Sequence, residues 1–125
     1  MIYLDTHVVV WLFSGLTDRF SKTAQRLVND NEVLISPVVR LELQYLFELQ
    51  RVVEAPDIIV ADLASRVGLQ VCSKPLNRIV TEALAYTWTR DPFDRLITAH
   101  AGVDDDLLLS KDANILRNYA HARWL

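Results

Sequence analysis

The segment RDPFDRLITAH, residues 90–100, places two aspartates three positions apart around a proline, directly before an apolar run. Asp91 fits the position before a helix, where its side chain can accept hydrogen bonds from free N–H groups, and Pro92 suits the first helical position. Asp94 would then lie in the first turn, where its charge suits the helix dipole, but Ile97 follows at the spacing of a buried face. Each carboxylate can therefore be a cap or a metal ligand.

Three further acids follow predicted strands. Asp5 closes the strand MIYLD, Asp112 follows the strand DLLLS, and Glu42 lies in the first turns of the helix after EVLIS. Because ligands bind at the carboxyl ends of parallel strands, these acids are expected at one functional edge of the sheet. The alternatives remain open: Asp5 and Asp112 can cap helices, with Thr6 competing as a cap, and Glu42 can reach solvent or pair with an arginine.

Glu42 is the most informative of these acids. Its helix, PVVRLELQYLFELQR, has an apolar stripe that we expect to face the core, formed by Val38, Leu41, Tyr45, Leu46 and Leu49. Glu42 lies on this stripe, four positions after Val38 and four before Leu46. A buried, unpaired carboxylate costs several kcal/mol, so its presence there favours a functional role.

Binding of a divalent cation would explain why several acids are clustered. Mg²⁺ prefers oxygen ligands and keeps several waters, and a bound metal lowers the pKa of water and polarises phosphate oxygens. The formal net charge is −3, the wrong sign for holding nucleic acid by bulk electrostatics. A metal or a basic partner would supply the missing positive charge.

The elements that must position these acids alternate along the chain. Short apolar strands are predicted at residues 1–5, 32–36, 69–73 and 106–110, and helices at 6–14, 21–30, 37–51, 56–68, 75–88, 92–102 and 112–119. Residues 121–125 are expected to add an edge strand. This alternation predicts a single α/β domain over residues 1–125, with three α/β/α layers and a mostly parallel sheet of four or five strands.

Composition excludes several classes of protein. Only three glycines are present, so a glycine-rich phosphate loop is excluded, and no apolar run approaches the ~18 residues of a membrane span. Cys72 is the only cysteine, which fits a reducing compartment, and we expect a cytoplasmic protein without a signal peptide. The histidines lack zinc-site spacing. The three tryptophans are expected in the core, and Asp104, Asp105 and Asp106 in a solvated loop.

Four segments together resemble a known family. YLDTHVVVWL, ISPVVRLEL, RDPFDRLITAHA and LLLSKDANI, in this order, resemble a PIN domain and specifically the VapC-type toxins of bacterial toxin–antitoxin pairs. The resemblance spans nearly the whole chain, and the pairing of LDTH with DPFDRL is its specific part. It implies a Mg²⁺- or Mn²⁺-dependent endoribonuclease that cleaves RNA by a metal-activated water, a VapB-type antitoxin as partner, and a homodimer.

The resemblance also implies roles for individual residues. Its catalytic acids are Asp5, Glu42, Asp94 and Asp112, and Asp5 and Asp94 are the metal ligands. Asp91 caps the helix, and Thr6 and Ser110 support the site; Ser110 stands where threonine is frequent in the family. The acidic loop at residues 104–106 is close to the site in sequence and is expected to discourage RNA on that side.

Two other functions remain open. A catalytically inactive PIN-fold module that only binds a partner would have the same sequence pattern. A receiver-like phospho-acceptor domain fits less well, because LDTH lacks an acidic pair and LQVCSKP lacks an acceptor aspartate. Metal-dependent RNA cleavage would separate these functions.

The antitoxin expectation has a physical basis in residues 40–63. Apolar residues in this segment exceed what one buried helix face needs: Phe47, Val52, Val53, Ile58 and Ile59 lie beyond the stripe. They are expected either to form a groove for a partner helix or to bury one another within the chain or a homodimer.

Overall fold

Five short strands form one parallel sheet at the centre of the molecule. The computed structural model describes residues 1–125, and its strands are β1 (Ile2–Leu4), β2 (Val33–Ile35), β3 (Gln70–Val71), β4 (Leu107–Leu109) and β5 (Ala122–Arg123). Their order across the sheet is β3-β2-β1-β4-β5, and every neighbouring pair is parallel. The central strand β1 is buried along its length, as expected for an apolar strand covered on both faces.

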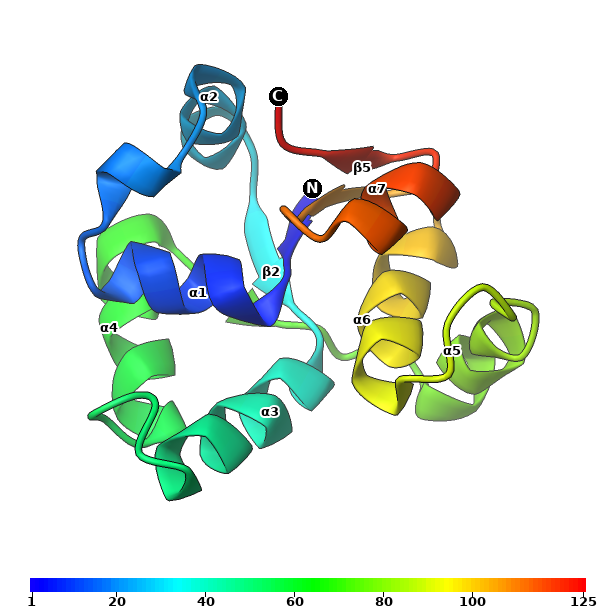
Figure 1. The fold of residues 1–125 in the computed structure, drawn as a ribbon, viewed down its shortest axis with the longest axis horizontal. Coiled ribbons are helices and arrows are strands. Elements are labelled where there is room, and N and C mark those ends of the chain that lie inside the picture. Colours follow the sequence, from blue (N-terminus) through cyan, green and yellow to red (C-terminus); the bar gives the residue numbers. More distant parts are fainter.

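Seven α-helices and one 3₁₀ turn connect the strands. They are α1 (Thr6–Phe13), η1 (Thr17–Arg19), α2 (Lys22–Asp30), α3 (Pro37–Glu48), α4 (Pro56–Val67), α5 (Leu76–Ala83), α6 (Pro92–Gly102) and α7 (Ala113–Asn118). Helices α1 and α4 lie on one side of the sheet and α5 and α6 on the other (Figure 1). The predicted three-layer α/β/α architecture is therefore confirmed, with five strands.

Several helix ends were visible in the sequence. Asp91 caps α6 through its side chain, as predicted, and Ser21 caps α2 in the same way at the predicted helix start. Helix α4 ends at Gly68, whose φ of +71° is a conformation that glycine adopts without steric cost. Helix α5, in contrast, stops at Ala83 instead of continuing to residue 88. The Ala83 carbonyl oxygen there accepts from the Tyr86 N–H and from the Arg95 guanidinium, both at 3.0 Å.

The strand order creates a reversal point beside β1. The chain places β2 and β3 on one side of β1, and β4 and β5 on the other. The connections after β1 and after β4 therefore leave two neighbouring strands in opposite directions along the sheet. The backbone N–H of Asp5 donates to the Leu109 carbonyl oxygen at 3.0 Å, which keeps the two strand ends level. Open α/β sheets bind their ligands at such a position.

The predicted core-facing stripe of α3 is wrong. The helix buries Val39 and Leu43, whereas Leu41, Tyr45 and Leu49 are exposed. Apolar residues occupy several faces of this helix, so periodicity could not decide which face packs, and contacts with α4 and α6 select the face of Leu43. Glu42 is consequently beside the buried face and half-buried, not in the middle of it.

The acidic loop before β4 is not simply solvated. Lys74 Nζ contacts the carboxylates of Asp104 at 2.9 Å and Asp106 at 3.2 Å. Because the loop precedes β4 whereas Asp112 follows it, the loop is at the opposite edge of the sheet from the predicted site. The loop is therefore not beside the site, and its expected effect on RNA stays a prediction. None of the helices has the length and apolar composition needed to cross a membrane.

The packing of α3 through Leu43 leads to a prediction about stability. Leu43→Ala should lower the free energy of unfolding by ~2–5 kcal/mol, because Leu43 is 0% exposed and its truncation leaves a cavity. Leu41→Ala is the matched control on the same helix, and since Leu41 is 62% exposed it should change stability by less than about 0.5 kcal/mol. Urea unfolding measures both, and a larger loss for Leu41→Ala would contradict this packing.

Candidate active site

A cleft of about 320 Å³ opens at the carboxyl edge of the sheet. Its lining residues are Asp5, Thr6, His7, Glu42, Leu46, Asp91, Asp94 and Asp112. The structure thus brings the four predicted catalytic acids together, with Asp91 beside them. No lysine or arginine lines the cleft, so nothing in its wall neutralises these carboxylates.

Asp5 is fixed by hydrogen bonds to both of its carboxylate oxygens. It precedes α1 as its N-cap, and Oδ1 accepts from the Thr6 N–H at 2.8 Å. Oδ2 accepts from the Ser110 hydroxyl at 2.6 Å. Asp5 is only 4% exposed, so these bonds also offset the cost of burying its charge.

Ser110 connects Asp5 to Asp112. Its buried hydroxyl donates to the Asp5 carboxylate and accepts from the Asp112 backbone N–H at 3.1 Å. One side chain therefore fixes the positions of both residues relative to each other. Asp112 caps α7, and its Oδ1 accepts from the N–H groups of Asn114 and Ile115 at 2.8 and 3.1 Å. The capping role considered for Asp112 is therefore real, and it occupies one of the two carboxylate oxygens.

Glu42 reaches the cleft from α3. The Thr6 hydroxyl donates a short hydrogen bond to Glu42 Oε1. Burial raises the pKa of the Glu42 carboxyl, the bond from Thr6 lowers it, and the nearby charges of Asp5 and Asp91 raise it further. Thr6 therefore does not compete with Asp5 as a cap; it holds Glu42 instead.

Asp91 and Asp94 differ as the sequence predicted. Asp91 is exposed, and its Oδ1 accepts from the N–H groups of Phe93 at 2.8 Å and Asp94 at 3.3 Å, as an N-cap does. Burial, followed by the charges of Asp91, Asp5, Asp112 and Glu42, raises the pKa of the Asp94 carboxyl to about 7. Asp94 is thus a half-buried carboxylate whose charge is destabilised by its neighbours.

His7 also lines the cleft, although the sequence patterns did not single it out. Its Nε2 accepts from the Lys111 N–H at 3.0 Å, so a neutral ring carries its proton on Nδ1, which lies 3.5 Å from Asp5 Oδ2. Burial lowers the pKa of His7, although the charges of Asp5 and Asp112 act in the opposite direction. Its position two residues after a strand-end acid, in the first turn of α1, was the one signal that could have found it.

The donor set fits a hard divalent cation. Carboxylate oxygens from separate elements converge on one cleft, and the raised pKa of Asp94 shows that positive charge there would be stabilised. No three histidine, cysteine or acidic side chains are close enough to form a complete set of metal ligands. Mg²⁺ suits this arrangement because it is commonly held by one or two carboxylates and completes its coordination with water.

Comparisons with known proteins agree with this fold. The PIN domain family model matches residues 2–121. Three solved structures are similar: VapBC2 from Rickettsia felis bound to a promoter DNA fragment (22% identity, TM-score 0.70, 100% of both chains), DNA-bound VapBC from Salmonella typhimurium (18%, 0.61, 98% of this chain and 94% of that chain) and VapBC-1 from nontypeable Haemophilus influenzae (17%, 0.63, 100% and 97%). At these identities the similarity shows the fold alone. No match was found among curated proteins.

The different positions of Asp94 and Asp91 predict different responses to metal. Asp94→Asn removes a half-buried, repelled charge, so it should raise the melting temperature of the metal-free protein at pH 8 by ~3–5 °C, or roughly 1 kcal/mol after discounting for solvent screening. Mg²⁺ should then stabilise the parent but not this variant.

Asp91→Asn is the matched control, because it removes one charge from the same cleft and keeps a capping side chain. It should retain most of the Mg²⁺ response in thermal unfolding and calorimetric titration. An equal loss of Mg²⁺ binding in both variants would contradict the division between a capping and a ligating aspartate.

Proposed function

Because the chain belongs to the PIN domain family, we propose that it is a divalent-metal-dependent endoribonuclease, the toxin of a VapBC-type pair acting in the cytoplasm. The observation that carries this proposal is the cleft at the carboxyl edge of the sheet, where five carboxylates meet without a lysine or arginine. An enzyme acting on a phosphodiester needs positive charge beside the substrate. Here a metal would have to supply it.

In this proposal Asp5 and Asp94 hold Mg²⁺ or Mn²⁺, and Glu42 and Asp112 complete the catalytic set. When bound, the metal would activate water and neutralise charge on the phosphate. The protein contributes position: Ser110 fixes Asp5 and Asp112 relative to each other, and Thr6 holds Glu42. Asp91 shapes the start of α6, so that Asp94 points into the cleft.

The proposal includes an antitoxin of the VapB type, since the similar solved structures are VapBC complexes. Part of the expected apolar excess is exposed around α3 and α4, namely Phe47, Val53 and Ile58. Three residues of the stripe that was expected to face the core are exposed beside them: Leu41, Tyr45 and Leu49. Ile59, in contrast, is in the core, which is the other alternative that the sequence left open. A homodimer, implied by the same resemblance, completes the proposed assembly.

Cleavage of RNA tests the catalytic proposal. The purified chain should cut single-stranded RNA in Mg²⁺ or Mn²⁺ and not in EDTA, leaving 5′-phosphate and 3′-hydroxyl ends. Asp5→Asn and Asp94→Asn should each lower the rate at least ~100-fold, since loss of outer-shell partners alone costs ~10–100-fold. Asp30→Asn, on the exposed end of α2, is the control and should retain the rate.

Three results would contradict this mechanism. Cleavage in EDTA would exclude metal dependence, and a 2′,3′-cyclic phosphate product would show attack by the RNA's own 2′-hydroxyl group. A folded chain that binds a partner but cuts no RNA would instead be the inactive PIN-fold module.

Partner binding is tested at Phe47. The reading frame immediately upstream is expected to encode a short, basic-tailed antitoxin, and its product should copurify with the chain. Phe47→Asp should weaken that complex at least ~10-fold, because it places a charge in an apolar interface. Val80→Asp is the control, since Val80 is equally exposed (36% against 37%) but lies on α5, across the sheet. Equal affinity of both variants would exclude Phe47 from the interface.

A further inference from the structure

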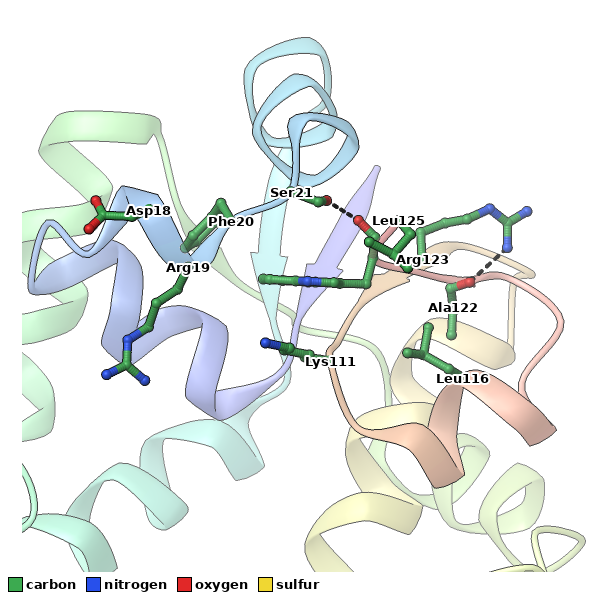
Figure 2. A pocket seen from close by; sticks show the side chains of 10 residues that line it. Asp18, Arg19, Phe20, Ser21, Lys111, Leu116, Ala122, Arg123 and Leu125 are labelled. Carbon is green, nitrogen blue, oxygen red and sulfur yellow. Dashed lines mark hydrogen bonds between the residues drawn. The ribbon is translucent and has the colours of Figure 1, made fainter.

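A second and larger cavity of about 620 Å³ lies between η1 and the segment that contains α7 and β5. Residues far apart in sequence form it, with Arg19 and Phe20 on one side and Lys111, Arg123 and Trp124 on the other. Figure 2 shows the ammonium end of Lys111 pointing toward the side of the cavity that carries Arg19. Its volume is within the ~300–1,000 Å³ typical of small-molecule sites.

This cavity is basic, in contrast to the acidic cleft. Arg19, Lys111 and Arg123 line it, and none of them is among the chain's ion pairs. Arg123 donates to backbone carbonyl oxygens of Ala120 and Ala122 instead. Asp18 is the only acidic side chain in the lining. A chain with a net charge of −3 thus places two cations without an ion-pair partner, Arg19 and Lys111, at one cavity.

The cavity and the cleft are adjacent. Lys111, which lines the cavity, lies between Ser110 and Asp112, and its N–H donates to His7 Nε2, in the cleft, at 3.0 Å. Trp11 contacts residues of both: its ring centroid is 4.9 Å from that of His7 and 5.7 Å from that of Trp124. The cations of Arg19 and Lys111 lie 5.4 and 5.9 Å from the same Trp11 ring. A polymer bound in the cleft would therefore extend onto this surface.

We propose that this cavity binds the stretch of single-stranded RNA that adjoins the scissile phosphodiester, an inference that rests on the proposed ribonuclease function. Arg19 and Lys111 neutralise phosphates that the acidic cleft would repel. The cavity, with Phe20 and Trp124 in its wall, has room for one base, which single-stranded RNA can present unstacked. RNA is favoured over an acidic protein partner because the cations adjoin the cleft in which a phosphodiester would be cut.

The test measures RNA binding in the Asp94→Asn background, in which the probe should stay intact. The probe is a fluorescein-labelled single-stranded RNA 10-mer of mixed sequence, followed by fluorescence anisotropy across salt concentrations. Arg19→Ala with Lys111→Ala should raise Kd about tenfold, the effect of two exposed ionic interactions. The slope of log K against log salt should become shallower by ~1.4, or ~0.7 for each phosphate that is no longer neutralised.

Two further variants separate the cavity from charge alone. Arg26→Ala with Arg51→Ala removes the same charge from exposed positions outside the cavity and should leave both Kd and the salt slope unchanged. Leu116→Trp fills part of the cavity without changing charge and should weaken binding, with thermal unfolding showing that it is folded.

The outcomes distinguish the two proposals. If the parent cuts RNA but the two double variants bind it equally, the cavity is not an RNA subsite and the proposed function stands. If Arg19→Ala with Lys111→Ala releases the copurifying antitoxin and leaves RNA affinity unchanged, the cavity serves the partner, which also overturns the inference. If the parent neither binds nor cuts RNA in Mg²⁺ or Mn²⁺, both proposals fail.

Discussion

Repulsion among five carboxylates in one cleft is the constraint that the rest of the structure must satisfy. Three of them, Asp5, Asp91 and Asp112, are N-caps, so backbone N–H groups and the positive ends of helix dipoles stabilise their charge. Glu42 and Asp94 are not N-caps, although Asp94 lies in the first turn of α6, and burial raises the pKa of both carboxyls. Helix starts thus make the acidic cluster tolerable, and a cation would make it favourable.

The parallel sheet brings these helix starts together. Since β1 and β4 are neighbours and end level with each other, α1 and α7 begin side by side. The Ser110 hydroxyl donates to the Asp5 carboxylate at one start and accepts from the Asp112 backbone N–H at the other. Helix α6 adds Asp94 from its first turn, and α3 adds Glu42 from its second. Each acid depends on a different element, so the cleft forms only when the whole fold is complete.

Local signals in the sequence predicted much of this arrangement. Strand–helix alternation, Pro92 after Asp91, and Gly68 each have a local physical cause, and the strand-end acids follow from the geometry of parallel sheets. The packing face of α3 could not be predicted, because apolar residues surround that helix and tertiary contacts choose among them. The basic cavity could not be predicted either, because its two sides, η1 and β5, lie about a hundred positions apart in sequence and no local pattern connects them.

The molecule carries an acidic cleft, in which we propose a cation, and a basic cavity, in which we propose its polyanionic substrate. Both proposals depend on a divalent metal bound in the cleft through Asp5 and Asp94. Crystals grown with Mn²⁺ and measured at the manganese absorption edge test this directly. We expect an anomalous peak between these two carboxylates that is lost in Asp94→Asn. A Mn²⁺ peak located only outside the cleft, or one that persists at full occupancy in Asp94→Asn, would contradict it.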